Sequence, residues 1–244
     1  MSDKPCILSS WVLSVFVIAF SIGSCTETNN VRDDKVKKEE FKLSSLAKND
    51  IDELMEIHVR RARVHLRDLL LKLYKRNPRE LKKSPYPTAE EDAERIFSRT
   101  TNWTFRELDG IQGTDAITLA FNDDYRGDRV FAFVMGMTSM VMASYHYKTE
   151  FFIYDSIDPQ GLYNSARNIE IAVWKLEHNR NRNGELFLLS NSRPGEPSNL
   201  SYERLLGKLI SLQDTMAEVI SASANRTISK IIQRMATAVF LPIP

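Results

Sequence analysis

Cysteine is scarce in this chain of 244 residues, since only Cys6 and Cys25 occur and both lie at its beginning. Everything after Cys25 lacks a thiol. This excludes a disulfide framework, a cysteine metal site and a cysteine nucleophile from the body of the chain.

Glycine and proline are also few, with nine of each, and strand-like apolar runs are short. A turn-rich β-sandwich or barrel needs more of both. Hydrophobic residues make up 43% of the chain, enough for a sizeable core. We therefore predict an all-α fold, a helical bundle-like globular domain over residues 45–244.

Excess charge of either sign is absent, because 33 lysines and arginines face 32 acidic residues. Without an excess of positive charge, the overall electrostatic potential does not favour binding to nucleic acid, and we expect no nucleic-acid partner. The chain also lacks a phosphate loop, a Gly-x-Ser-x-Gly elbow and a zinc motif. We assign no catalytic residue, metal ligand or cofactor, and favour a protein that is not an enzyme.

Charge is missing altogether from residues 5–26, where the apolar run from Ile7 to Phe20 is followed by Ile22-Gly23-Ser24-Cys25. This tetrapeptide resembles the lipobox of bacterial lipoproteins: an aliphatic residue, two small residues beside the scissile bond, then the acylated cysteine. The resemblance implies a signal peptide over residues 1–24 and a mature chain that begins at Cys25, carrying diacylglycerol and fatty acids such as palmitate.

In bacterial lipoproteins the residue after the cysteine influences sorting, and Thr26 implies the periplasmic side of the outer membrane rather than retention at the inner one. The polar residues 25–44 would form a tether, and a flexible coil of that length spans on the order of 25 Å. The alternative is an uncleaved N-terminal helix in the inner membrane, because about 20 apolar residues suffice to span a bilayer.

Apolar periodicity and capping signals predict helices in the body. Asn77-Pro78 ends the first, Thr88 and Glu91 form a capping box, and Asp158-Pro159 starts a later helix. The expected helices cover residues 46–76, 88–98, 113–121, 130–145, 159–179 and 201–240, the last either continuous or broken at 221–225. The segment 130–145 is apolar nearly all round, which indicates a buried central helix, with a second membrane segment as the alternative.

The densest aromatic stretch runs from Tyr145 to Tyr163 and is the first candidate for binding a partner. A loop packed on a neighbouring helix would use the same residues. The candidate contact residues in this stretch are Tyr145, Tyr147, Phe151, Phe152, Tyr154 and Tyr163.

A second candidate surface is basic and lies on the first long helix, where Arg60, Arg63 and Arg67 recur. It is either one solvated face or a docking site for an acidic partner. His58 and His65 share the apolar stripe of the same helix, which favours hydrogen-bonded core roles over metal binding. For the acidic run at Glu90–Glu94 we expect a solvated first turn.

These features together predict a non-enzymatic envelope lipoprotein, an accessory or scaffold component attached to the membrane through its lipid and contacting a protein partner. The competing interpretation is an envelope enzyme or small-ligand receptor. Such a protein would use a pocket between helices near the methionine-rich segment, with His58, His65 or His146.

Overall fold

The computed structural model describes residues 50–98, 103–152, 155–192 and 195–244. The predicted signal peptide, Cys25 and the whole predicted tether therefore lie outside the described residues. The described part of the chain is helical, as predicted. Its helices are α1 (Asp50–Arg76), α2 (Pro78–Leu81), α3 (Ala89–Phe97), α4 (Gly113–Ala120), α5 (Arg129–Ala143), α6 (Pro159–His178) and α7 (Ser201–Ala224), with short 3-10 turns at Arg106–Leu108 and Met235–Thr237.

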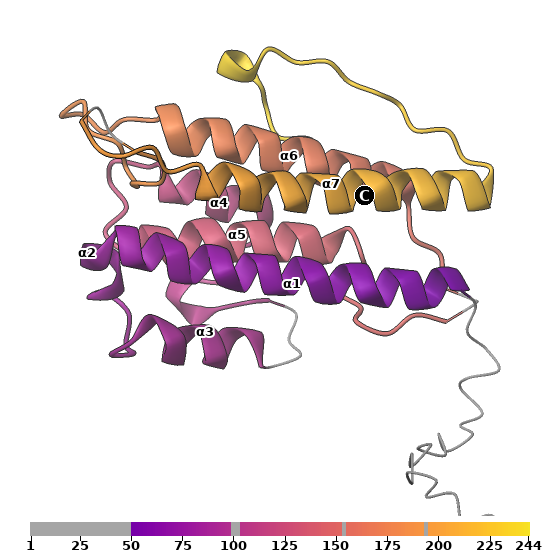
Figure 1. Ribbon diagram of the computed structural model, residues 1–244, viewed down its shortest axis with the longest axis horizontal. Helices are drawn as coiled ribbons and strands as arrows, with labels where there is room; N and C mark the ends of the chain where they lie inside the picture. Colours follow the sequence, from indigo (N-terminus) through magenta and orange to yellow (C-terminus); the bar gives the residue numbers. More distant parts are fainter. Residues whose placement is uncertain (1–49, 99–102, 153–154, 193–194) are drawn as a thin grey trace, which may run out of the picture. The chain divides into compact units, whose positions relative to one another are not determined.

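Four long helices, α1, α5, α6 and α7, form a bundle in which successive members alternate in direction (Figure 1). The end of α1 meets the start of α7, where Lys72 Nζ donates to Ser201 Oγ at 2.7 Å. The start of α1 meets the segment after α5, where the Phe151 amide donates to Glu56 at 3.0 Å. The bundle is therefore of the up-down-up-down kind.

Helix α5 is the centre of the core, because every residue from Val130 to Met142 is buried. The prediction of a central helix is confirmed. Asp128 caps the helix by accepting a hydrogen bond from the Phe131 amide at 2.9 Å. No helix in the described ranges is long and apolar enough to cross a bilayer.

Helix α4 packs against α5 at a very short distance, which a glycine allows. A Cβ atom added to Gly136 would lie 2.6 Å from the backbone nitrogen of Ile117 and 2.8 Å from the carbonyl oxygen of Gly113. At the same contact, the Gly113 amide donates to Ser139 Oγ at 2.8 Å. A side chain of α5 thus caps the start of α4. Gln112, the N-cap residue just before α4, makes no capping hydrogen bond with its own side chain.

A buried amide joins three helices in the middle of the bundle. Gln213 of α7 is fully buried and accepts a hydrogen bond from Tyr145 Oη at 2.9 Å. Its nitrogen donates to Ser144 Oγ at 3.0 Å and to Ser165 Oγ at 2.9 Å. Each of these four polar side chains therefore has at least one hydrogen-bond partner in the core.

Helix α7 stops at Ala224, within the range 221–225 where a break was one of the two predicted alternatives, but the residues beyond the break do not form the helix predicted up to Phe240. Asn225 takes the left-handed conformation, φ 50°, which ends the helix as a left-handed cap does. The following residues 225–244 are extended apart from one 3-10 turn, and they run back over α6 (Figure 1). We call residues 225–244 the strap.

Candidate functional site

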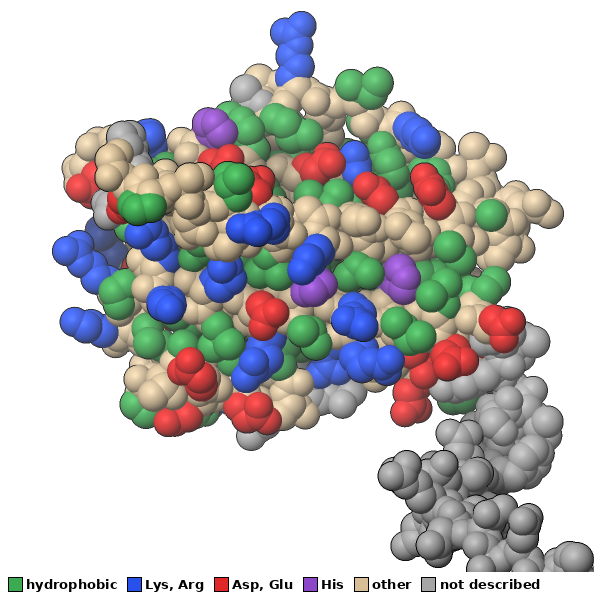
Figure 2. Space-filling view, in the orientation of Figure 1, with side chains coloured by type: hydrophobic (Ala, Val, Ile, Leu, Met, Phe, Trp, Pro, Cys, Tyr) green, Lys and Arg blue, Asp and Glu red, His purple; other side chains and the backbone are tan. Residues whose placement is uncertain are grey.

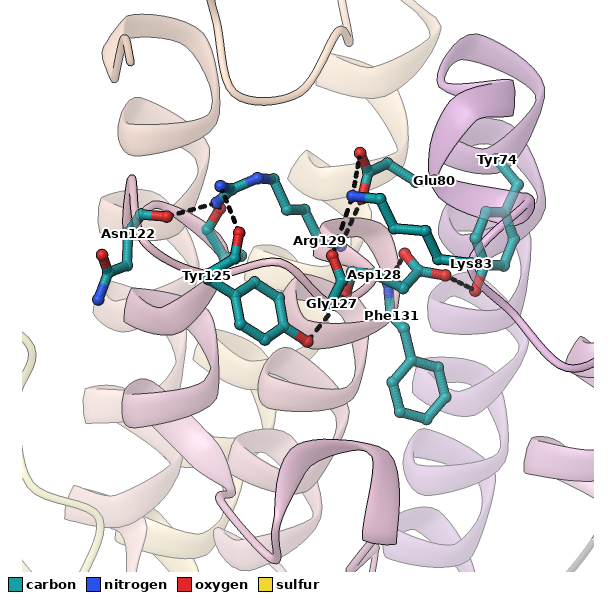
Figure 3. Close-up of polar contacts among 10 residues, drawn as sticks. Tyr74, Glu80, Lys83, Asn122, Tyr125, Gly127, Asp128, Arg129 and Phe131 are labelled. Atoms are coloured by element: carbon teal, nitrogen blue, oxygen red, sulfur yellow. Dashed lines mark hydrogen bonds and ion pairs between the residues drawn. The ribbon is translucent and has the colours of Figure 1, made fainter. Parts of the chain in front are cut away.

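Polar residues from several segments meet at the end of the bundle where α1 ends and α5 begins (Figure 3). Glu80 of α2 accepts a hydrogen bond from the Arg129 amide at 2.7 Å, and Lys83 donates both to Glu80 and to the Gly127 carbonyl. The side chain of Arg129 donates to three backbone carbonyls, those of Ala120, Asn122 and Tyr125, each at 2.8 Å. These bonds fix the loop at residues 121–128 against α2.

A pocket of about 250 Å³ opens beside this loop, and two buried carboxylates line it. Asp92 of α3 is fully buried, and Asp128 is 9% exposed. We call it the Asp128 pocket; its other lining residues are Lys83, Ser84, Pro85, Arg95, Glu107, Tyr125, Arg126, Gly127 and Phe131.

The hydroxyl of Tyr74 lies between these two carboxylates. Tyr74 Oη is 2.7 Å from Asp128 Oδ2 and 3.1 Å from Asp92 Oδ2. A phenol has one proton and can donate to only one of them at a time. If both carboxylates are ionised, one of the two short oxygen–oxygen contacts therefore has no hydrogen atom between the oxygens, and these repel each other. A proton on Asp128 removes this repulsion, because the contact then becomes a hydrogen bond.

The pKa values favour that arrangement. Burial, with smaller effects from the Glu80 and Asp92 charges, raises the pKa of Asp128 to about 6. Hydrogen bonds from the Phe131 amide and from Tyr74 act in the opposite direction and lower it in part. Burial, and the charges of Asp128 and Asp92, also raise the pKa of the Tyr74 hydroxyl well above its ordinary value. Asp128 is thus the group in the pocket that exchanges a proton near neutral pH, while Tyr74 keeps its own.

Arg95 provides the counter-charge for Asp92. Its Nε and Nη2 atoms both donate to one oxygen, Asp92 Oδ1, at 3.0 and 2.8 Å, and the opposite charges strengthen these hydrogen bonds. The guanidinium also lies over three aromatic rings, with centroid distances of 4.8, 5.7 and 5.5 Å for Tyr86, Phe105 and Phe131. These contacts fix the buried ion pair on one side of the pocket.

A larger groove adjoins the Asp128 pocket and has a volume of about 1270 Å³. Asn77 holds one wall in place, because its amide bonds both the N–H and the carbonyl of Leu189, at 2.7 and 2.8 Å. Six arginines and four carboxylates line it. They are Arg76, Arg79, Arg126, Arg129, Arg180 and Arg182, with Glu80, Asp123, Glu177 and Glu185. We call this the arginine groove, and Figure 2 shows basic side chains gathered at the same, left end of the view.

Four of the six arginines are engaged within the protein. Arg76 pairs with Glu196, Arg182 with Asp123 and Asp124, and Arg129 and Arg180 donate to backbone carbonyls. Arg79 and Arg126 are exposed and have no ion pair or hydrogen bond in the part of the chain that the structure describes. These two guanidinium groups are available to an anion.

Two neighbouring carboxyl groups, one of which lines the groove, carry less negative charge than two separate glutamates would. Glu177 and Glu203 are hydrogen-bonded to each other, and Asn191 Nδ2 donates to both. Burial and the neighbouring Glu203 charge raise the pKa of Glu177. The pair therefore shares a proton at higher pH than an isolated glutamate would, which leaves the groove more positive.

The predicted aromatic contact residues do not form one surface. Tyr145 and Phe151 are fully buried in the core and pack edge to face, with ring centroids 6.2 Å apart. Tyr147 is 38% exposed, Phe152 is half-buried, and Tyr163 contacts the strap. Tyr154 lies outside the described residues. A partner that meets the folded domain does not reach Tyr145 or Phe151.

The predicted basic face of α1 is only partly free. Arg60 is exposed and Arg67 half-buried. Arg63 donates to the Phe97 carbonyl at 2.7 Å and lies over the Trp103 ring, so it joins α1 to the segment after α3.

The three histidines considered for a pocket between helices lie apart from the two cavities described above. His58 is buried, with Nδ1 3.3 Å from the Leu212 carbonyl oxygen, and His65 Nδ1 is buried without a hydrogen-bond partner among the residues that the structure describes. Burial lowers the pKa of both. His146 is exposed in the turn after α5.

The expectation for the acidic run is wrong at one residue. Glu90, Glu91 and Glu94 are exposed, but Asp92 is buried beneath the Asp128 pocket. Sequence reasoning also missed Asp128 and Arg126, which stand in an Arg-Gly-Asp tripeptide among turn-forming residues. Asp128 directly before an apolar helix was the available signal, since aspartate is a preferred N-cap.

Comparison of the chain with protein-family models, with curated proteins and with solved structures gave no match.

Proposed function

We propose that the protein is a non-enzymatic lipoprotein of the bacterial envelope, an accessory or scaffold component that binds an acidic segment of a protein partner in its arginine groove. The exposed guanidinium groups of Arg79 and Arg126, which have no ion pair or hydrogen bond within the described ranges, carry this proposal. Arginine presents a planar fork of donors that matches carboxylate geometry.

The dimensions of the groove favour an extended segment over a small molecule. Ligand pockets for small molecules are typically about 300–1,000 Å³ and close around their ligand, whereas the groove has about 1270 Å³ and polar walls. Three segments far apart in the sequence supply its arginines: the end of α1 with α2, the loop before α5 with the first residue of α5, and the loop after α6.

Charge reversal tests the groove. We expect Arg79→Glu with Arg126→Glu to weaken binding of a fluorescent oligoglutamate peptide to the full chain in detergent by about tenfold or more, as loss of charge pairs at a binding surface does. Peptide fluorescence anisotropy measures the affinity. Both residues are exposed, so the unfolding temperature should not change.

The matched control reverses Arg60 and Arg61, which are exposed on α1 away from the groove. We expect the peptide affinity of this variant to stay within about twofold of the wild type, since screening limits the effect of distant surface charges. Equal losses in the two variants would assign the binding to net charge alone and reject the groove.

The lipid anchor is the second part of the proposal and depends on the lipobox-like Ile22-Gly23-Ser24-Cys25. We propose attachment through acylated Cys25 to the periplasmic side of the outer membrane, with an uncleaved inner-membrane helix as the alternative. The expected intact mass of the membrane-extracted protein is that of a chain that begins at a diacylated or triacylated Cys25. A Cys25→Ser variant should lose this modification, and an unmodified full-length wild-type chain would reject the anchor.

A second candidate function, a small-ligand receptor or enzyme, is favoured by the Asp128 pocket. A buried carboxyl group with a pKa of about 6 can give or take a proton near neutral pH. Small molecules that stabilise the wild type against heat but not the Asp128→Asn variant would favour this function over a contact role.

A further inference from the structure

The strap is attached to α6 by side-chain amides that bind its backbone. Gln160 Oε1 accepts from the Ser229 amide at 2.8 Å, and Gln160 Nε2 donates to the Ser229 carbonyl at 3.2 Å. Asn168 makes the same pair of bonds with Leu241, at 2.6 and 2.8 Å. An amide supplies one donor and one acceptor face, so each attachment is made without using a side chain of the strap.

Between these two attachments the strap forms an arch, residues 230–240, on the outer side of α6 (Figure 1). Tyr163 Oη of α6 holds the start of the arch, because it accepts from the Ile231 amide at 3.3 Å and lies 3.4 Å from the Ile231 carbonyl oxygen. Gln233 closes the arch, because its amide bonds both the N–H and the carbonyl of Val239, at 2.9 and 3.2 Å. The 3-10 turn Met235–Thr237 lies within this closed part. Backbone contacts therefore define the arch, and several of its side chains point into solvent.

Those side chains are unusually apolar for a surface. Ile232 is 98% exposed, Val239 68%, Ile231 43% and Met235 36%. These four are half of the eight large hydrophobic side chains that are exposed among the described residues, and they lie within nine consecutive positions. Single exposed hydrophobics are ordinary, but a cluster of them marks a contact surface.

The charge of the same segment has one sign. No aspartate or glutamate occurs from residue 219 to residue 244, whereas Arg226, Lys230 and Arg234 do. Lys230 is near enough to Asp214 of α7 to influence its pKa. Arg226 and Arg234 have no ion pair in the part of the chain that the structure describes. Along the upper edge of Figure 2, hydrophobic and basic side chains lie together.

We propose that the arch is a membrane-contact element that inserts Ile231, Ile232 and Met235 into the headgroup–acyl boundary of an anionic bilayer. Lys230 and Arg234 bind the lipid headgroups. Apolar side chains flanked by cations, without acidic residues, are the pattern that anionic membrane surfaces bind. From the proposed function, this inference takes only that the folded domain is held near a bilayer. It needs neither acylation of Cys25 nor the arginine groove.

The test places a fluorophore on the arch of the full chain reconstituted in vesicles. In a Cys6→Ser, Cys25→Ser background, Ile232→Cys is the only thiol and is labelled with nitrobenzoxadiazole. With phosphatidylglycerol in phosphatidylcholine vesicles we expect blue-shifted emission and quenching by doxyl-labelled lipid at least about threefold greater than in phosphatidylcholine alone. Lys230→Glu with Arg234→Glu should return quenching to the phosphatidylcholine level.

The matched control is Val64→Cys on α1, an aliphatic residue that is 49% exposed and also flanked by arginines. We expect its label to stay water-like in both kinds of vesicle. An unquenched label at position 232, or equal quenching at positions 64 and 232, would overturn the proposal and leave a protein partner as the occupant of the arch. Flotation of the chain with the vesicles is scored separately, so failure of the arch is distinguished from failure of membrane attachment.

Discussion

Gly136→Ala is expected to lower the free energy of unfolding by about 3 kcal/mol or more, at the upper end of overpacking effects. The added methyl group would lie 2.6 Å from a backbone nitrogen and 2.8 Å from a backbone oxygen of α4. Neither atom can rotate away as a side chain could, so α4 and α5 must separate. Urea denaturation followed by circular dichroism measures the loss.

Gly207→Ala in α7 is the matched control, because both positions are interior helix residues. A Cβ atom at Gly207 would meet nothing within 4 Å. Alanine there removes the conformational freedom of glycine and should stabilise the protein by about 0.5–1 kcal/mol. A Gly136→Ala protein as stable as the wild type would show that the close contact of α4 and α5 is not needed.

The second large effect is a change in pH dependence when Asp128 is replaced by asparagine. The pKa of Asp128 is raised from 3.8 to about 6 in the folded protein, so the folded state binds more protons than the unfolded state between these values. The stability contributed by the protonated carboxyl is complete below about pH 4 and is lost as pH rises through 6. A shift of this size corresponds to about 3 kcal/mol.

Asparagine resembles the protonated acid, because its oxygen can still accept from the Phe131 amide while its nitrogen can donate towards Tyr74. We therefore expect Asp128→Asn to match the wild type near pH 4 and to exceed it by about 2–3 kcal/mol near pH 8. Urea denaturation at both pH values gives the comparison.

Asp128→Ala separates this effect from helix capping. The alanine variant loses the cap at both pH values, at a cost of about 1 kcal/mol. If wild type and Asp128→Asn instead lose stability in parallel from pH 4 to pH 8, the Asp128 carboxyl is not protonated in the folded protein.

Local signals were enough to predict several helices. Thr88 accepts from the Glu91 amide and Asp158 from the Gln160 amide, as expected for N-caps. Capping involves residues two or three positions apart, so the sequence contains the whole interaction. The segment 130–145, which is apolar nearly all round, likewise predicted a helix buried on all sides, with a second membrane segment as the alternative.

The site could not be predicted in the same way, because its partners are distant in the chain. Asp92 has an ordinary first-turn position with Arg95 one turn further along the same helix, and only the packing of α1, which brings Tyr74 to it, makes it a buried carboxylate. The arginine groove combines three segments whose proximity depends on the bundle. The number of charged residues in any one of these segments does not by itself indicate a binding site.

The strap shows where periodicity misleads. Ile228, Ile231, Met235 and Val239 recur at helical spacing, yet the chain leaves the helix at Asn225. Its backbone groups find hydrogen-bond partners in Gln160 and Asn168 of α6 instead of in a further helical turn. Side chains from another helix can thus supply hydrogen bonds to backbone groups in a segment whose apolar spacing alone predicts a helix.

The sequence by itself determined the all-α class, the central helix and most helix boundaries, because these follow from apolar spacing and from caps formed within a few residues. Only the tertiary structure decided which charges are buried, which arginines lack a partner among the described residues and which apolar side chains are exposed. Burial and pairing depend on neighbours from other helices, and that information exists only once the helices have packed.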